Sequence, residues 1–223
     1  MNRLLIGFVV MILSCSYHDS RLKIFNSKLN TDKANELTGL VGHFNVYLSE
    51  LYPDLGDFDS RFTKLLADLE KNRYNVSGNH VLTDSVSKSV VDAYRLSGLD
   101  KELWIKQSEF DSISKNLASE QNEQVEELVI EENIIDSLAL ADTFELYHTN
   151  IYSGYHTGLS QFVNDEFIKE YLDAREKMGD LTLSVMIGAF IAWSDRVDYN
   201  DPILKRIVTM EVFVPIAYQS MKD

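Results

Sequence analysis

The chain has 223 residues, of which 45% are hydrophobic and 11% aromatic, and this composition excludes a disordered chain. Its length suits one domain with a sizeable core. With 21 basic and 35 acidic residues, the formal net charge of −14 disfavours nucleic acid and anionic lipid surfaces as partners and suits a basic protein. A surface that is kept soluble by like-charge repulsion is the simpler explanation of the same charge.

The first fourteen residues have the layout of a signal peptide. Arg3 supplies a positive charge, and residues 4–13 form an uncharged, mostly apolar run about as long as a signal-peptide core. Polar residues from Tyr17 onward follow too soon for a membrane span, which needs roughly 20 apolar residues. We therefore expect residues 1–14 to be removed.

The sequence Ile12-Leu13-Ser14-Cys15 resembles the lipobox of bacterial lipoproteins, although Ile12 and Leu13 depart from the commonest pattern. The resemblance covers about the first sixteen residues. It implies that Cys15 becomes the first mature residue and carries acyl chains such as palmitate, which anchor the protein to the membrane. The alternatives are an ordinary cleaved signal and an apolar N-terminal helix with an incidental thiol.

The same resemblance implies a location in the bacterial envelope. Ser16 stands where an aspartate would favour the inner membrane, so we expect an outer-membrane lipoprotein facing the periplasm. Cleavage would remove Arg3 and leave 20 basic against 35 acidic residues, a net charge of −15. Because Cys15 is the only cysteine, we expect no intramolecular disulfide and no cysteine-ligated metal.

The remaining chain predicts an all-α fold, a single bundle-like domain of about seven to nine helices over residues 31–223. Residues 15–30 are expected to form the lipidated N-terminus and a tether, with at most a short docked segment. Apolar residues at three- and four-residue steps predict the helices, and turn or cap residues delimit them. Helix starts are expected at Thr31 or Asp32, within 57–60 and at Asp201-Pro202, and helix ends before Pro53 and at Gly98 and Gly179.

Three further segments have distinctive patterns. Residues 122–150 predict the longest helix, with glutamates in its first half, where they complement the helix dipole. Leu181 to Trp193 is apolar nearly all round, so we expect it to be the buried central helix, capped by Asp180. Pro215 is expected to kink or end the last helix, with a strand over 212–214 as the alternative.

Few residues suggest chemistry. Glu145 and His148 have the Glu-x-x-His spacing of di-iron carboxylate bundles, but a second copy is lacking, so a structural role is favoured. His148 and His156 flank a tyrosine-rich turn and are weak candidates for a shared metal with Glu145 or Asp142. No nucleotide-binding, hydrolase or zinc-protease motif occurs, and we expect no cofactor and no catalytic residue.

The tyrosine-rich turn itself is a candidate partner-binding surface. Tyr152 and Tyr155 would serve this purpose if they were exposed, because tyrosines are frequent at protein interfaces. Half-buried packing at helix ends is the alternative role for both side chains.

Together these features predict a lipid-anchored, non-enzymatic helical protein that binds a protein partner through an acidic surface. An immunity-type lipoprotein and an accessory subunit of an envelope complex are two concrete versions. A metal-assisted or cell-wall hydrolase using His148, His156 and nearby carboxylates is one alternative, and a structural envelope lipoprotein is another.

Overall fold

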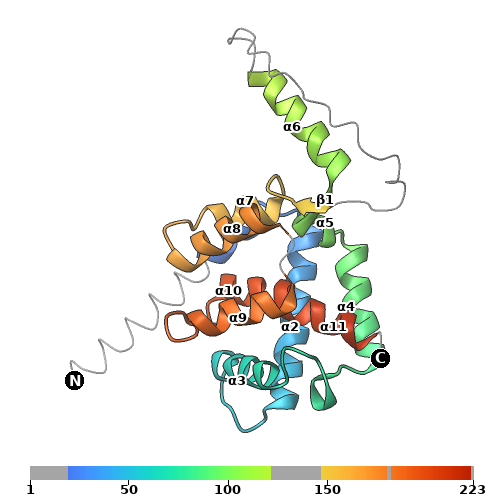
Figure 1. The fold of residues 1–223 in the computed structure, drawn as a ribbon, viewed down its shortest axis with the longest axis vertical. Helices are drawn as coiled ribbons and strands as arrows, with labels where there is room; N and C mark the ends of the chain where they lie inside the picture. The colour runs from blue at the N-terminus through green and yellow to red at the C-terminus, as the bar shows by residue number, and fades with distance from the viewer. Residues whose placement is uncertain (1–19, 122–146, 180–181, 222–223) are drawn as a thin grey trace, which may run out of the picture.

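The computed structural model describes residues 20–121, 147–179 and 182–221 and confirms the all-α prediction, with 72% helix and 4% strand (Figure 1). None of the described helices is both long and apolar enough to cross a membrane. A helix over residues 20–26 comes first. It is followed by α2 (Thr31–Leu51), α3 (Phe58–Lys71), the short 3₁₀ turn η1 (Gly78–His80), α4 (Asp84–Leu96), α5 (Asp100–Leu103), β1 (Trp104–Lys106), α6 (Gln107–Gln121), β2 (Tyr147–Thr149), α7 (Gly154–Ser160), α8 (Glu166–Met178), α9 (Leu183–Trp193), α10 (Pro202–Val208), η3 (Thr209–Phe213) and α11 (Val214–Ser220).

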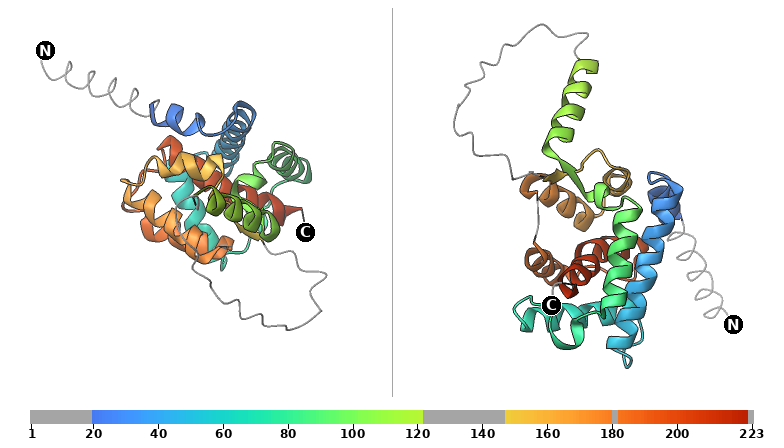
Figure 2. Two further views of the ribbon diagram at one scale, coloured as in Figure 1. Left: turned by 90° about the horizontal axis from the view of Figure 1, so that it is seen from above. Right: turned by 90° about the vertical axis from the view of Figure 1, so that its right-hand side faces the viewer.

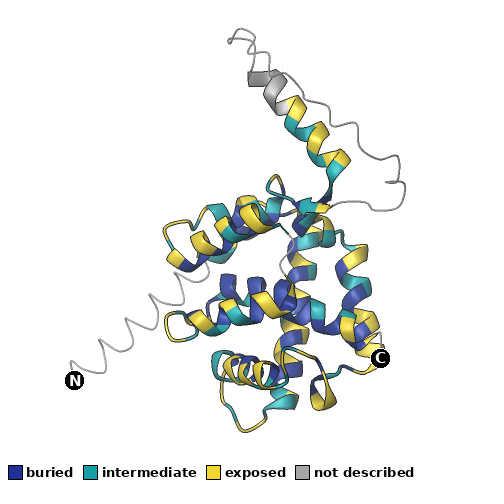
Figure 3. Ribbon diagram, in the orientation of Figure 1, coloured by how far each residue is buried: buried dark blue, intermediate teal, exposed yellow. Residues whose placement is uncertain are grey.

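The C-terminal run of α10, η3 and α11 lies at the centre of the domain. Every residue from Ile207 to Val214 is buried, and the burial colouring shows this run as the most continuously buried part of the ribbon (Figure 3). Helices α2 and α9 pack against η3, while α4 packs against α11. The hydrophobic core therefore forms around the end of the chain.

The prediction that 181–193 is the central helix is wrong. Helix α9 begins at Leu183 after the N-cap Thr182, and the expected cap, Asp180, lies outside the described residues. One face of α9 is open to solvent, with Val185 46% exposed and Ala189 and Ala192 also exposed. Because alanine and valine count as apolar in the sequence, the segment looks apolar on every face. These side chains are small, so exposing them leaves little apolar surface in water.

The helix does not end at Pro215, and no strand forms over 212–214, because residues 209–220 are helical throughout. Residues 209–213 form a π-helical turn, and Pro215 is the second residue of α11. Proline has no N–H to donate to the preceding turn, and here that turn departs from the α-helical hydrogen-bonding pattern. The wider π turn relieves the clash between the proline ring and the carbonyl four residues earlier.

Residues 20–29, which precede the expected start at 31, already belong to the folded part of the chain. Phe25 is fully buried and Leu29 nearly so, both within the core, so the expected tether does not extend over these residues. Helix α2 is capped by Asn30, whose Oδ1 accepts a hydrogen bond from the Lys33 N–H at 2.8 Å, and not by the expected Thr31 or Asp32.

Other predicted boundaries are confirmed. Helix α2 ends at Leu51, two residues before Pro53, and Asp57 caps α3. Gly98 and Gly179 adopt positive φ angles of 73° and 66° after α4 and α8. Asp201 caps α10 and Pro202 opens it, as the sequence indicates.

The helix predicted over 122–150 does not reach Asn150. Residues 122–146 lie outside the described part of the chain, but 147–149 form β2, which pairs antiparallel with β1. Trp104 is opposite Thr149, and Ile105 is opposite His148. Aromatic and β-branched residues favour such a pair over a helix end. Helix α6 follows β1 directly and projects from the body in two orthogonal views (Figure 1, Figure 2).

The docking of residues 20–29 requires close approach at two glycines. A Cβ on Gly154 would lie 2.2 Å from the Lys28 carbonyl oxygen, and a Cβ on Gly158 would lie 2.8 Å from the Phe25 ring. A Cβ on Gly188 in α9 would meet nothing within 4 Å apart from the backbone of its own helix, so this glycine offers a matched control.

We expect Gly154→Ala to lower the free energy of unfolding by about 1–3 kcal/mol, because a backbone oxygen cannot move away cheaply. Gly188→Ala should leave it unchanged or raise it by up to about 1 kcal/mol through helix propensity. Urea denaturation of both variants measures the difference, and equal stability of the two would contradict the packing described.

Candidate functional site

The structure separates the two tyrosines that the sequence proposes as a binding surface. Tyr155 is 2% exposed and meets the Phe25 ring edge-on at 5.7 Å, so it is a core residue and is not available to a partner. Tyr152 is 38% exposed, and its hydroxyl lies 3.0 Å from Ser114 Oγ on α6. Of the predicted pair, only Tyr152 remains a surface candidate.

The weak metal candidates have other roles among the described residues. Nε2 of His148 is hydrogen-bonded to Gln107, and the ring stacks on Phe110 at 5.1 Å between centroids. His156 is half-buried, and its Nε2 lacks a hydrogen-bond partner among the described residues. Glu145 and Asp142 lie outside the described part of the chain. Over residues 20–121, 147–179 and 182–221, no three His, Cys, Asp or Glu side chains are grouped to hold a metal ion.

A buried ion pair beneath the β1–β2 pair was not predicted. Arg175 of α8 and Glu211 of η3 are 1% and 5% exposed, and Nη2 lies 3.6 Å from Oε1. Tyr171 donates to the same carboxylate oxygen at 2.5 Å, and the Arg175 guanidinium lies 4.1 Å from the centre of the Trp104 ring. The sequence feature that could have indicated a buried charge is Glu211, which stands inside the mostly apolar run of residues 207–214.

The pKa values in this cluster follow from burial and from the neighbouring charges. Burial and the negative charge of Glu211 raise the pKa of the Tyr171 phenol well above its usual value. Burial opposes the charged form of Arg175, but Tyr171 and Glu211 outweigh it and raise the pKa of the guanidinium. The position of the pair across α8 and η3 suits a structural role.

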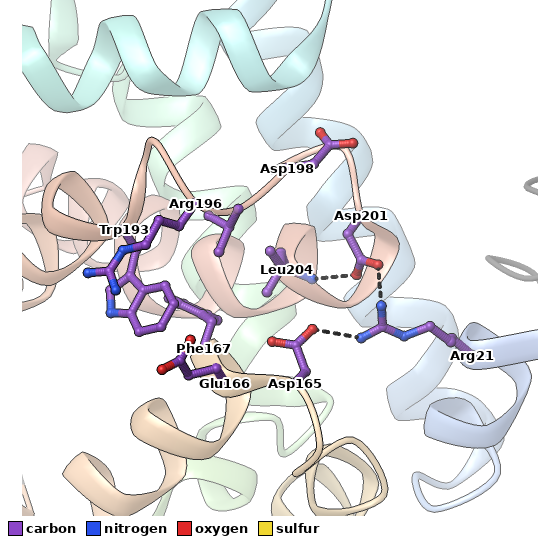
Figure 4. A pocket seen from close by; sticks show the side chains of 10 residues that line it. Arg21, Asp165, Glu166, Phe167, Trp193, Arg196, Asp198, Asp201 and Leu204 are labelled. Carbon is purple, nitrogen blue, oxygen red and sulfur yellow. Dashed lines mark hydrogen bonds and ion pairs between the residues drawn. The ribbon is translucent and has the colours of Figure 1, made fainter.

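A pocket lies elsewhere, where the starts of α8 and α10 meet the end of α9 (Figure 4). Its volume is about 320 Å³, at the small end of the range for ligand sites. It is lined by Arg21, Asp165, Glu166, Phe167, Trp193, Arg196, Val197, Asp198, Asp201 and Leu204, and we refer to it as the acidic pocket.

One wall of the acidic pocket is fixed by Arg21, from the helix of residues 20–26. Its guanidinium contacts Asp201 at 2.7 Å and Asp165 at 3.4 Å, and it lies 4.9 Å from the centre of the Phe162 ring. Both aspartates also cap helices, with Asp165 accepting from the Ile168 N–H and Asp201 from the N–H groups of the first turn of α10. The two aspartates of this wall are therefore held both by hydrogen bonds from backbone N–H groups and by ion pairs with Arg21.

The opposite wall is aromatic and carries a second guanidinium. Arg196 lies over the Trp193 ring at 4.3 Å from its centroid, and Phe167 meets Trp193 edge-on at 5.5 Å. Glu166 and Asp198 are exposed at the rim. The Glu166 carboxylate makes no hydrogen bond or ion pair with the described residues, so it is accessible to a ligand.

The chemistry of the acidic pocket favours binding of a cation. Four carboxylate residues and two arginines line the pocket, so its lining has a net negative formal charge. The lining contains no serine, threonine, cysteine or histidine to act as a nucleophile or a proton shuttle. Aromatic and carboxylate groups together are the surroundings that a guanidinium or ammonium group prefers.

The pocket was not foreseen because its residues come from three distant segments, 21, 165–167 and 193–204. The Asp201-Pro202 cap was visible in the sequence, but its contact with Arg21 was not. Comparison with known protein families, with curated proteins and with solved structures gives no match to this chain.

His156 should make stability depend on pH. Burial lowers the pKa of its imidazole, Glu176 opposes the shift, and Arg175 adds to it. Because the unfolded chain then binds the proton more readily, the free energy of unfolding should fall as the pH drops below about 6.5. We expect His156→Gln to reduce the loss of stability between pH 7.5 and pH 5.5 in urea denaturation. The exposed His43→Gln is the control, and an unaltered loss in His156→Gln would contradict this explanation.

Glu211→Gln should be strongly destabilising, because it leaves the Arg175 charge buried without its counter-ion. A loss of about 3–5 kcal/mol is expected from breaking one side of a buried pair. Glu50→Gln, at an exposed position of α2, should change stability by less than about 0.5 kcal/mol. Thermal and urea denaturation measure both, and similar values would show that the Arg175 charge is solvated or paired elsewhere.

Proposed function

We propose that the chain is a lipid-anchored, non-enzymatic helical protein of the bacterial envelope that binds a basic protein partner through the acidic pocket. An immunity-type lipoprotein or an accessory subunit of an envelope complex would both fit this role. The observation that carries the proposal is the acidic pocket, which is built partly by Arg21, six residues after the proposed lipid attachment at Cys15.

The covalent geometry limits how far this pocket can lie from the membrane. An extended chain covers at most about 3.6 Å per residue, so the six steps from Cys15 to Arg21 span no more than about 22 Å. Because Arg21 is held by two ion pairs, the pocket stays within that reach of an acylated Cys15. In this proposal the pocket lies close enough to the membrane to contact a partner that acts at the membrane surface.

The charge of the whole chain supports the same kind of partner. A net charge of −14 attracts basic proteins over distances comparable to the screening length and raises their association rate. The pocket adds short-range contacts that can select among them, because Glu166 and Asp198 are exposed at its rim.

The proposal predicts that partner capture depends on both the anchor and the pocket. In a bacterial host, wild type should fractionate with the outer membrane and Cys15→Ala should not. Crosslinking should capture a basic protein, and Glu166→Gln with Asp198→Asn should reduce the yield about tenfold. The control Glu50→Gln with Asp54→Asn removes the same charge at exposed positions near the α2–α3 connection and should retain capture.

Three results would contradict the proposal. Cys15→Ala could remain anchored, which would exclude the lipid attachment. Equal loss of capture in the two double variants would show that capture depends on the total charge and not on the pocket. Stoichiometric zinc or iron in the purified protein, with no partner captured, would instead support the alternative of a metal-assisted hydrolase.

A further inference from the structure

We propose that the acidic pocket is a receptor for an arginine side chain of the partner, and that Arg196 occupies its aromatic platform in the free protein. This inference rests on the proposed function and adds the identity of the bound group. The platform is Trp193, whose ring carries the Arg196 guanidinium at 4.3 Å (Figure 4).

The protein itself shows that the site suits a guanidinium. Arg196 stacks on Trp193, and at the other wall Arg21 stacks on Phe162 and contacts two carboxylates. A planar guanidinium can stack on a ring and pair with a carboxylate at its edge, which an ammonium group cannot do in the same way. Arg21 therefore shows the full arrangement proposed for the partner's arginine, and Arg196 shows its aromatic half.

Arg196 is held loosely enough to be displaced. It is exposed, and its side chain makes no hydrogen bond or ion pair with the described residues, so stacking on the Trp193 ring is what holds its guanidinium. Arg21 differs, because its side chain is only 12% exposed and bridges two helix caps. An incoming arginine would thus exchange with Arg196 and leave Arg21 in place.

The Glu166 carboxylate provides the counter-charge that Arg196 does not use. Glu166 lines the same pocket as the Trp193 ring, and Figure 4 shows its carboxylate on the Trp193 side of the hollow. A guanidinium on the ring could therefore reach this carboxylate from the solvent side. The volume of about 320 Å³ suits one long side chain better than a large cofactor.

Tryptophan fluorescence can test this directly, because the chain has only Trp104 and Trp193. In the full mature chain carrying Trp104→Phe, emission reports on Trp193 alone. We expect a hexa-arginine peptide to change this emission and to bind at least tenfold more tightly than hexa-lysine at the same ionic strength. Glu166→Gln should weaken hexa-arginine binding about fivefold.

The Arg196→Ala variant shows whether Arg196 covers the Trp193 ring or itself helps to bind the peptide. Arg196→Ala should bind hexa-arginine about fivefold more tightly, since the platform is then open. Lys115→Ala, at an exposed position of α6, removes the same charge and should improve binding by less than twofold.

The failures are separable. Unchanged or weaker binding by Arg196→Ala would overturn the exchange of Arg196, and equal affinity for the two peptides would overturn arginine selectivity. Neither result touches the proposed function, which fails instead if Glu166→Gln with Asp198→Asn leaves binding of both peptides unaltered. Circular dichroism of each variant establishes that it is folded.

Discussion

The ion pairs of Arg21 with Asp165 and Asp201 join three parts of the chain that are far apart in sequence. They fix the helix of residues 20–26 against the starts of α8 and α10, while Phe25 is buried over Gly158. The acidic pocket exists because these contacts form. They also place Arg21, six residues after Cys15, in the wall of the pocket. Pocket and fold are therefore linked through one short docked segment.

The core depends on a different constraint, the complete burial of the C-terminal run. Glu211 lies in this run, and its charge is balanced by Arg175 from α8, with Tyr171 completing the group. Such a group contributes little net stability over an apolar replacement, but it penalises any packing that separates its members. The π-helical turn that contains Glu211 also accommodates Pro215 immediately afterwards. The buried run of residues 207–214 thus contains a buried ion pair as well as apolar side chains.

Local signals in the sequence predicted local structure well. Asp57 and the Asp201-Pro202 pair gave the correct helix starts, and Gly98 and Gly179 gave the correct ends, because capping depends on a few neighbouring residues. Non-local outcomes were less predictable. Hydrophobicity alone made 181–193 the apparent centre, although small residues leave one face of α9 exposed. The pocket and the Arg175–Glu211 pair depend on residues brought together only by folding, so the sequence could at most mark Glu211 as unusual and could not identify its partner.

The docked segment of residues 20–29 is tested most directly by amide hydrogen exchange in the full mature protein. We expect amides near Phe25 to exchange slowly, with protection that approaches that of the buried face of α2, because both belong to one core. Exchange as fast as that of an unstructured peptide, alongside a protected α2, would contradict this expectation. The pocket wall at Arg21 would then be unformed.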